Sequence, residues 1–341
     1  MDIIFNCLDS GLGNNGGSRT IVRSANTLKK LGHNVVILNP PRKRKKLDQI
    51  DNETAYTWDV IDVPVMSEGW GHLKADVIIA TAFASVKTTV SAPDSCGMKV
   101  HWLRGWETWR HSEDWIVKNV LNQPTLKIVN SLCLQDKLKE FNVESEIIRP
   151  GYDFTELKPL DTRQNIKTIT LGGLYSKGDK RKTKRVEWIF EAVKQIKKDR
   201  KICLVMFGAD GSPSVYDPFD IFKSNPDPKI KNQLYNSCDI WLAPTENDSL
   251  HLPPAEAMIT ECCVVGTDTP MNGMKDYLIN METGLVSMNS ITSFENTIRL
   301  LINDIDLRLE LGKAGRKKIL SLGTREYNMN ILLNYLEDNM L

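Results

Sequence analysis

The sequence predicts an α/β protein of two domains, each with a parallel β-sheet covered by helices. Short apolar runs alternate along the chain with segments of helical periodicity, which is typical of parallel sheets with helices on both faces. The 341 residues are long for one domain and sufficient for two, each with its own core. Between the two alternating stretches lie residues 149–153, whose Pro-Gly pair predicts a turn or hinge.

The first half opens with a strand, a glycine-rich loop, a helix and a second strand. Residues 2–8 form a short apolar run, residues 11–17 are rich in glycine, and apolar side chains then recur at helical spacing up to Leu31. Gly32 is a typical helix end, and the continuous apolar run 35–38 predicts the next strand. Further buried strands of this sheet are expected at residues 76–80 and 127–130.

The second half repeats this alternation from about residue 165. The expected strands are residues 168–171, 202–207, 239–243 and 263–267, and the expected helices are residues 186–198, 229–236 and one that starts at Pro254. The tail from Arg325 is amphipathic. We therefore predict an N-terminal domain of residues 1–152, a C-terminal domain of residues 153–324, and a terminal helix, residues 325–341, that packs back on the first domain.

The composition favours a globular protein without a membrane span. Hydrophobic residues make up 41% and charged residues 26%, and the net charge of +1 gives no bulk attraction to nucleic acid. The chain lacks a run of about eighteen apolar residues, and its start, with Asp2 and no basic stretch, predicts a strand rather than a signal peptide. The seven cysteines include no C-x-x-C pair, so we expect a cytoplasmic protein without disulfides or a zinc site.

The segment of residues 239–257, DIWLAPTENDSLHLPPAEA, carries the clearest chemistry. It predicts a strand, a polar loop, and a helix that starts at the proline pair. Backbone N–H groups at such a helix start, between Ser249 and Leu252, favour a diphosphate, whereas Asp248 and Glu256 suit the vicinal hydroxyls of a sugar. The alternative is an ordinary loop in which Glu256 only stabilises the start of the helix.

This segment resembles the E-x7-E signature of retaining family-4 glycosyltransferases. Asp248 takes the first acidic position and Glu256 the second, and the Leu-Pro and Glu-Ala-Met parts of the pattern are intact. Other segments resemble motifs of that family in the same order along nearly the whole chain. They are IIRPGYD at residues 147–153, LYNSCDI at residues 234–240, CVVGTD at residues 263–268 and TGLV at residues 283–286.

The resemblance implies the GT-B fold, in which two doubly wound, Rossmann-like domains face a central cleft. By that likeness Glu256 binds the donor ribose, Asp248 holds hydroxyls of the transferred sugar, and both are candidate catalytic residues. The expected donor contacts between these two acids are Ser249, Leu250, His251 and Leu252. An aspartate replaces the usual glutamate and His251 replaces the usual glycine, which leaves the donor sugar open. His251 is either a donor contact or a packing residue.

A basic segment, SKGDKRKTKR, ends at residue 185 and joins the first strand of the second domain to its helix. In the family that the chain resembles, an arginine and a lysine of this region neutralise the departing diphosphate. Gly173 occupies the arginine position, so Arg181 is the candidate substitute. Counting back from the helix selects Lys184 as the catalytic lysine, and counting forward from the strand selects Lys177. We favour Lys184, and the alternative for the whole segment is a solvated charged face.

Glycines near two strand ends are candidates for close backbone approach to the donor. Gly16 and Gly17 precede the first helix, where the resembled family has a Gly-Gly pair near the donor phosphate and the acceptor. Gly208 ends a predicted strand of the second domain and is placed in the donor site. Glycine-rich turns also open NAD-binding units, but here Asn39 follows the second strand, where such units carry an acidic residue.

A tryptophan-rich stretch, HWLRGWETW, is the candidate acceptor site because aromatic faces stack on sugars. The predicted acceptor contacts are Trp102, Trp106 and Glu107. His101 and Arg104 both match the place of a catalytic-site residue in the resembled family, and both stay candidates. The alternative is the tryptophan-rich edge of a hydrophobic core.

We therefore predict a retaining glycosyltransferase that moves a hexose from a nucleotide diphosphate sugar, with UDP- or GDP-sugar favoured. The acceptor is the hydroxyl of a glycan, a lipid-linked molecule or a small molecule. No Asp-x-Asp pair stands where it could hold a metal on the diphosphate, so neither a metal nor a cofactor is expected. The rival predictions are a sugar-nucleotide epimerase of the same fold and a non-catalytic module that binds nucleotide sugars.

The basic run from Arg42 to Lys46 follows the second predicted strand. It predicts peripheral contact with the inner face of a membrane, and the alternative is a solvated loop. The sequence leaves the nucleotide base, the donor sugar, the acceptor and the oligomeric state open.

Overall fold

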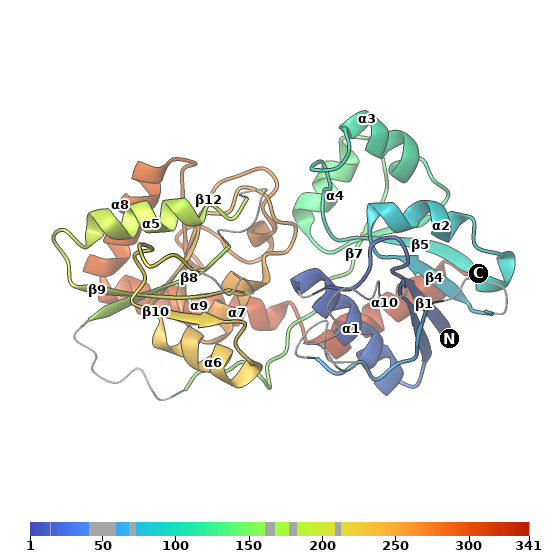
Figure 1. Ribbon diagram of the computed structural model, residues 1–341, viewed down its shortest axis with the longest axis horizontal. Coiled ribbons are helices and arrows are strands. Elements are labelled where there is room, and N and C mark those ends of the chain that lie inside the picture. Colours follow the sequence, from blue (N-terminus) through green and yellow to red (C-terminus); the bar gives the residue numbers. More distant parts are fainter. Residues whose placement is uncertain are drawn as a thin grey trace. The chain divides into compact units, whose positions relative to one another are not determined.

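The computed structural model of the chain describes residues 1–13, 15–40, 59–67, 73–160, 168–176, 183–208 and 213–340. The chain divides into two compact units (Figure 1). The first comprises Met1–Gly151 and Arg325–Leu341, and the second comprises Tyr152–Thr324. The change from one unit to the next therefore falls within the Pro-Gly segment that the sequence marks as a turn or hinge.

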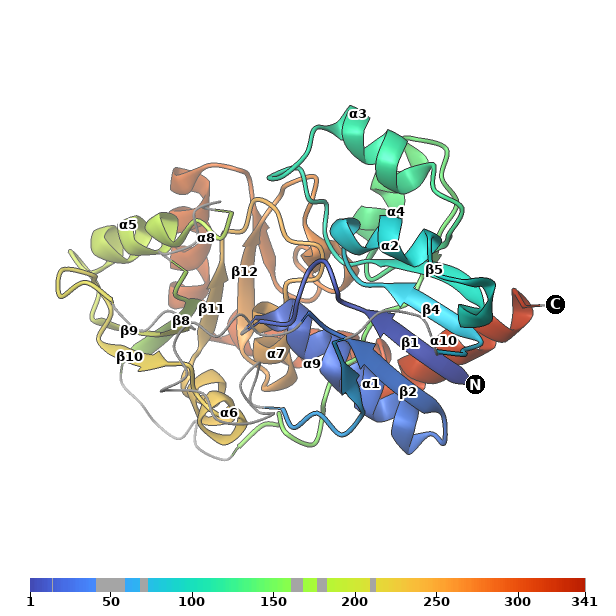
Figure 2. The ribbon, with the colours of Figure 1, turned by 45° about the vertical axis from the view of Figure 1, so that its right-hand side comes forward.

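The first unit is built on a parallel sheet with the strand order β3-β2-β1-β4-β5-β6-β7 among the described residues. Figure 2 shows β4 and β5 following β1 across this sheet. The strands are β1 (Asp2–Asn6), β2 (Asn34–Leu38), β3 (Val65–Met66), β4 (Val77–Ala80), β5 (Met98–Leu103), β6 (Leu126–Val129) and β7 (Glu146–Ile147). The four strands that the sequence predicts for this half are present with small shifts, and β3, β5 and β7 are additions.

Helices cover both faces of this sheet, as expected for a doubly wound unit. They are α1 (Gly16–Lys30), α2 (Val86–Val90), α3 (Glu113–Ile116), α4 (Leu132–Lys139) and α10 (Arg325–Asp338), with short turns of other helix types, η1 (Phe83–Ser85), η2 (Asp94–Cys96) and η3 (Val117–Leu121). The side chain of Asn15 accepts a hydrogen bond from the Ser18 N–H at the start of α1, and Gly32 takes a φ of +91° just after its end.

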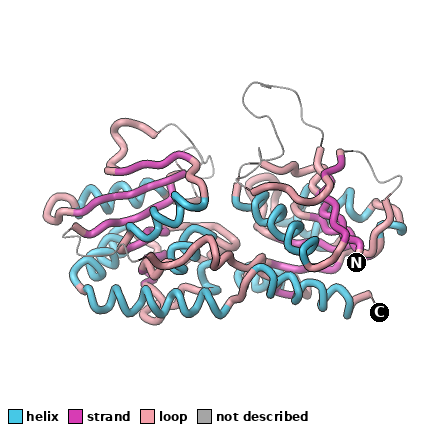
Figure 3. Tube along the Cα trace, turned by 90° about the horizontal axis from the view of Figure 1, so that it is seen from below, coloured by secondary structure: helices cyan, strands magenta, loops and turns pink. Residues whose placement is uncertain are grey.

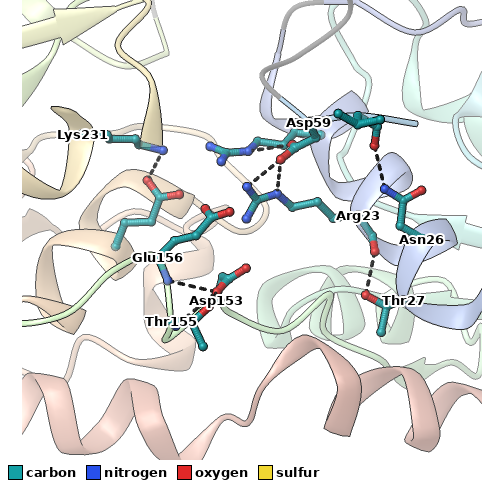
Figure 4. A network of polar contacts seen from close by, with 11 residues as sticks. Arg23, Asn26, Thr27, Asp59, Asp153, Thr155, Glu156 and Lys231 are labelled. Atoms are coloured by element: carbon teal, nitrogen blue, oxygen red, sulfur yellow. Dashed lines mark hydrogen bonds and ion pairs between the residues drawn. The ribbon is translucent and has the colours of Figure 1, made fainter. Parts of the chain in front are cut away.

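The first core joins the two ends of the chain. Apolar side chains of α1 pack in one cluster with β1, β2, β4 and β5, and α10 adds Met329, Leu332, Leu333 and Leu336 to it. On its other side α1 carries Arg19 and Arg23, which both pair with Asp59 (Figure 4). The terminal helix is therefore part of the first hydrophobic core.

The second unit has a parallel sheet with the strand order β10-β9-β8-β11-β12-β13 among the residues that the structure describes. The strands are β8 (Ile169–Leu174), β9 (Ile202–Gly208), β10 (Ile221–Ser224), β11 (Ile240–Ala243), β12 (Cys263–Thr267) and β13 (Leu285–Ser287). The strands β8, β9, β11 and β12 lie where the sequence predicts them. The edge strands β10 and β13 are additions.

Helices lie on both sides of the second sheet, and Figure 3 shows helices beside the strands in each unit. They are α5 (Val186–Ile196), α6 (Pro228–Ser237), α7 (Leu252–Ile259), α8 (Ile291–Asn303) and α9 (Ile305–Ser321), with the short turn η4 (Gly273–Asp276). Side chains of α5 and α8 pack in one apolar cluster, and side chains of α6 and α7 pack in another. This arrangement confirms the predicted α/β class with two doubly wound sheets.

Two further findings concern the chain as a whole. All seven cysteines are free thiols. Within the described ranges, no helix has the length and apolar character needed to cross a lipid bilayer.

Candidate functional site

The carboxyl edge of the second sheet collects the residues with the clearest chemistry. Because the strands are parallel, the loops after β8, β9, β10 and β11 all start at this edge. The strand order reverses between β8 and β11, and doubly wound sheets bind ligands outside the strand ends at such a point. Lys184 follows β8 and Asp248 follows β11, whereas Lys231 and Glu256 lie near the starts of α6 and α7.

Lys184 and Asp248 form an ion pair between the two loops at this reversal. The loops are held together by two more contacts. The Glu246 N–H donates to the Thr183 carbonyl at 2.8 Å, and Arg185 pairs with the Glu246 carboxylate at 3.0 Å. The structure thus brings the predicted catalytic lysine and the first acidic residue of the E-x7-E-like segment together.

Asp248 also shapes the turn that leads into α7. Its Oδ1 accepts hydrogen bonds from the N–H groups of Leu250 at 3.3 Å and His251 at 3.2 Å. Its own backbone bonds to the segment after β12, because its N–H donates to Met271 and its carbonyl accepts from Gly273. Two of the amides that the sequence assigns to a diphosphate are therefore engaged by Asp248 in this structure.

His251 occupies the position before α7 in a left-handed conformation, with a φ of +48°. Glycine adopts this conformation most easily, which explains why a glycine is usual there in the resembled family. The ring is buried, and Nδ1 lies 3.1 Å from the Thr245 hydroxyl. Burial, with a smaller effect of the Lys184 charge, lowers the pKa of His251 well below its usual value. These contacts match the packing alternative for His251.

The donor contacts on either side of His251 are enclosed as well. Ser249 and Leu250 are buried, and Leu252 is the first residue of α7. The Tyr277 hydroxyl donates to the His251 carbonyl at 2.6 Å and so fixes the backbone before the helix. Pro253 and Pro254 have no N–H groups, so the first turn of α7 carries few backbone donors.

Glu256 is held by two residues of α6. Lys231 Nζ lies 2.5 Å from Glu256 Oε2, and the Tyr235 hydroxyl donates to the same oxygen at 2.7 Å. In Figure 4 the dashed line at the labelled Lys231 marks this ion pair. The Lys231 ammonium also lies over the rings of Phe207 and Tyr235, 6.0 and 5.9 Å from their centres. Lys231 and Tyr235 are not among the site residues predicted from the sequence, although their spacing of four residues on a helix is a usable signal.

The predicted glycines of the second unit lie at different depths. Gly173 lies within β8, and a Cβ there would come within 3.0 Å of Ile189 and 3.2 Å of Met206, so it faces the core beneath α5. Gly208 ends β9, and a Cβ there would meet the Tyr175 carbonyl at 2.3 Å. Gly173 thus serves packing in this structure, whereas Gly208 permits a close approach of two backbones at the sheet edge.

Other predicted residues lie outside the described residues. They are Lys177, Arg181 and the basic run from Arg42 to Lys46. Across the ranges that the structure does describe, no three His, Cys, Asp or Glu side chains gather so that they could hold a metal ion.

Arg104 is the centre of the candidate site in the first unit. It follows β5 and donates to the Gly17 carbonyl at 2.6 Å and to the Thr81 carbonyl at 2.5 and 3.1 Å. Gly17 permits this contact, because a Cβ at this position would lie 3.2 Å from Arg104 Nη1. Gly16 begins α1 in the same loop. Of the predicted residues of this unit, Arg104, Gly16 and Gly17 are brought together at the carboxyl ends of β1, β4 and β5.

His101 and Trp102 lie in the core, which argues against the predicted substrate contacts. His101 is in the middle of β5, fully buried, and its two ring nitrogens have no hydrogen-bond partner among the described residues. Burial, with the charges of Lys127 and Arg104, lowers the pKa of His101 to about 3. Trp102 is also fully buried and packs 6.5 Å from the Phe5 ring. Both side chains fit the alternative of a tryptophan-rich core edge.

Trp106 and Glu107 are likewise tied to neighbouring elements. Trp106 is buried, donates from Nε1 to Glu113 at 3.1 Å and stacks on Phe141. Glu107 accepts a hydrogen bond from the Phe83 N–H at 3.3 Å. The exposed aromatic residues of this region are Trp109, 45% exposed, and Trp115, 37% exposed. Which tryptophans of this stretch are buried and which are exposed depends on the elements that pack around β5 and its following loop.

The second unit matches a known family. Residues 169–304 match the family model described as glycosyl transferases group 1. No curated protein sequence matches the chain.

Several solved structures share the fold over nearly the whole chain. Sucrose-phosphate synthase from Thermosynechococcus elongatus is 14% identical, with a TM-score of 0.78 over 99% of this chain and 98% of that chain. HepE from Anabaena, solved in complex with UDP and glucose, is 14% identical, with a TM-score of 0.75 over 99% and 100%. A glycosyltransferase from Rickettsia africae is 14% identical, with a TM-score of 0.72 over 99% and 98%.

At 14% identity, the solved structures establish the fold, which is GT-B. The family match covers residues 169–304, which include Lys184, Asp248 and Glu256. The chain therefore carries a glycosyl transferases group 1 domain on a GT-B fold and is a glycosyltransferase.

Proposed function

We propose that this glycosyltransferase moves a hexose from a UDP- or GDP-linked donor to an acceptor hydroxyl with retention of anomeric configuration. The observation that carries the proposal is the double pairing at the carboxyl edge of the second sheet. Lys184 meets Asp248 there, and Lys231 meets Glu256. Structures of HepE in complex with UDP and with UDP-glucose, together with the family match, support a nucleotide-sugar donor.

Lys184 is suited to the donor diphosphate. Its loop follows β8 at the reversal of strand order, where doubly wound sheets bind ligands. Its ammonium is paired with Asp248 in the structure, and a diphosphate would take over this charge compensation. Asp248 would then hold hydroxyls of the transferred sugar. Lys184 would then face the negative diphosphate, and the Asp248 carboxylate would exchange its cation for hydrogen bonds from the sugar hydroxyls.

Glu256 is suited to the donor ribose. An ionised carboxylate has two acceptor oxygens and no donor, so it can receive both O–H groups of a vicinal diol. Glu256 lies on the second turn of α7, whereas Asp248 lies in the loop before the helix. This spacing lets the two acids contact opposite ends of one donor molecule, the ribose and the transferred sugar.

The transfer needs no nucleophile from the protein. The bond between the sugar C1 and the β-phosphate oxygen breaks, and the acceptor oxygen bonds to C1 on the same face. The acceptor proton passes to the departing phosphate oxygen, so the nucleoside diphosphate leaves with the electron pair of the broken bond. Lys184 would stabilise the charge that develops on this diphosphate. We propose a metal-independent reaction because cationic side chains supply this charge.

The acceptor side is assigned to the first unit. Arg104 joins Gly17 to Thr81 at the carboxyl edge of its sheet and so orders the loop in front of α1. We propose that this edge receives the acceptor, which is a glycan, a lipid-linked molecule or a small molecule. We also propose a cytoplasmic protein that touches the inner face of a membrane through its basic run from Arg42 to Lys46.

A donor screen tests the activity. UDP, GDP, ADP and dTDP sugars should be compared by their effect on the melting temperature, and the best donor then incubated with and without acceptors. Transfer predicts that nucleoside diphosphate appears only when an acceptor is present. A changed sugar without this release would identify an epimerase. Tight donor binding with neither result would identify a binding module.

Two variants test the site. Glu256→Ala should weaken nucleoside diphosphate binding by roughly tenfold or more, because a hydrogen bond to a charged group is lost. Lys184→Ala should lower kcat by roughly 100-fold to 1,000-fold with a smaller change in KM, as for other lost charge-stabilising donors. Lys229→Ala is a matched control because Lys229 is exposed on α6. Wild-type behaviour of both site variants would refute the assignment.

A further inference from the structure

We propose that Lys231, together with Tyr235, is a positioning residue that aims the Glu256 carboxylate at the donor ribose. The inference rests on the proposed ribose-binding role of Glu256. It adds to that role two residues of a different helix, which hold the carboxylate from the side of α6.

Both partners bind one oxygen of the carboxylate. Lys231 Nζ lies 2.5 Å from Glu256 Oε2, and the Tyr235 hydroxyl donates to the same atom at 2.7 Å. Lys231 and Tyr235 are four residues apart on α6, so they extend from the same face of the helix. Two contacts from different directions to one oxygen fix the plane of the carboxylate and the direction of its second oxygen.

Lys231 is itself held in place. Its ammonium lies over the rings of Phe207 and Tyr235, at 6.0 and 5.9 Å from their centres, and the positive charge is attracted to both ring faces. Tyr235 is fully buried and packs edge-on against Phe207, with 5.4 Å between ring centres. Lys231 and Tyr235 are therefore held in place by the core of the second unit.

The ion pair between Lys231 and Glu256 is shielded from water, which increases the effect of removing either partner. The Glu256 and Lys231 side chains are only 13% and 14% exposed, whereas the Lys197–Asp220 pair on the same unit is 31% and 43% exposed. Exposed pairs contribute little, but removal of one partner from an enclosed pair leaves a charge that water compensates poorly. Without Lys231, the Glu256 side chain would turn toward other partners, and its alignment with a ribose diol would be lost.

The experiment measures recognition of the ribose hydroxyls separately from the rest of the nucleotide. Dissociation constants of UDP and 2′,3′-dideoxy-UDP, with GDP and its dideoxy analogue as a second pair, are measured by calorimetry on the full chain. The ratio of the two constants is the ribose discrimination. The wild type should favour the ribose form by roughly 10-fold to 100-fold, the range of hydrogen bonds to a charged group.

Lys231→Gln should weaken UDP binding about tenfold and leave dideoxy-UDP binding unchanged, so that the discrimination falls. Lys231→Arg, which keeps the charge, should recover most of it. Tyr235→Phe removes one hydroxyl from the core and should reduce the discrimination by a smaller factor, about threefold. Lys229→Gln removes the same charge from an exposed position on the same helix and should keep wild-type values.

The outcomes separate this inference from the function on which it rests. Equal weakening of both ligand forms by Lys231→Gln would show a direct phosphate contact and overturn the positioning role. Unchanged discrimination in both Lys231→Gln and Tyr235→Phe would overturn it as well. A wild type without ribose discrimination would overturn the role of Glu256 itself. Circular dichroism checks the fold of each variant, and Tyr235→Phe carries the test if Lys231→Gln does not fold.

Discussion

At the scale of single residues, burial decides what His101 and His251 can do. Both were candidates for contact with the substrates, and both rings are enclosed by protein. In each case burial is the largest cause that lowers the pKa of the imidazole, and nearby cations add to it. A neutral ring without access to solvent cannot act as a charged ligand for a phosphate. Residue type alone does not distinguish such a histidine from a catalytic one.

His101 has a consequence for stability in acid. Its folded-state pKa of about 3 lies below the ordinary 6.5, so only the unfolded chain takes up a proton as the pH falls below that value. The contribution of the neutral His101 to the free energy of unfolding is therefore complete above the ordinary pKa. It is lost in acid, by about 2 kcal/mol between roughly pH 7 and pH 5. Urea unfolding at several pH values measures this loss.

His101→Leu should remove that part of the acid sensitivity. It also removes two buried ring nitrogens without a hydrogen-bond partner among the described residues, so stability at neutral pH should be unchanged or higher. An acid sensitivity of His101→Leu equal to that of the wild type would contradict this account.

At the scale of elements, the segment before α7 and the terminal helix α10 support the two candidate sites. The segment before α7 combines the left-handed backbone of His251, the hydrogen bond from the His251 N–H to Asp248 and the hydrogen bond from Tyr277 to the His251 carbonyl, and these three features determine its path. In the first unit, α10 plays the corresponding structural role. It adds four apolar side chains to the core that supports β1, β4 and β5, whose ends present Arg104 and Gly17.

The contribution of α10 can be measured with one pair of variants. Leu332 is fully buried, so Leu332→Ala should cost about 2–5 kcal/mol of the free energy of unfolding of the first unit. Asn334→Ala, at an exposed residue of the same helix, should change it by less than about 0.5 kcal/mol. Calorimetric unfolding of both variants provides the comparison. Similar effects of the two substitutions would mean that α10 does not belong to this core.

At the scale of the whole molecule, the two units carry different parts of the chemistry. Lys184, Asp248 and Glu256 all belong to the second unit, which contains the family match, whereas Arg104 belongs to the first. Each unit has a hydrophobic core of its own. A ligand that binds one unit should therefore protect that unit directly, without a uniform effect along the chain.

Hydrogen exchange with nucleoside diphosphate tests this division. UDP or GDP at about 100 times its dissociation constant should slow exchange around Lys184 and from Leu250 to Leu252, since binding at this concentration stabilises the folded state by about 2.7 kcal/mol. Exchange within β1 and β4 should stay the same, and slower exchange at Gly16 and Gly17 would support their predicted donor role. Unchanged exchange in both loops of the second unit would contradict the proposed donor site.

The sequence by itself determined the fold class, the main strands and the segment between Asp248 and Glu256. Buried parallel strands such as β2, β9 and β12 are continuous apolar runs, and their pattern is local. Edge strands such as β3 and β10 were not predicted, because two to four partly exposed residues contain too little pattern. Such strands form only when a neighbouring strand offers backbone hydrogen bonds.

Only the tertiary structure decided which side chains meet and which are enclosed. Lys184 pairs with Asp248, and Lys231 with Glu256, across separations that a local pattern does not encode. The enclosure of His101 depends on β4 and β6, which flank β5. The strands and helices with strong local patterns follow from the sequence itself, whereas edge strands, burial and charge pairing depend on the position of segments far apart in the chain.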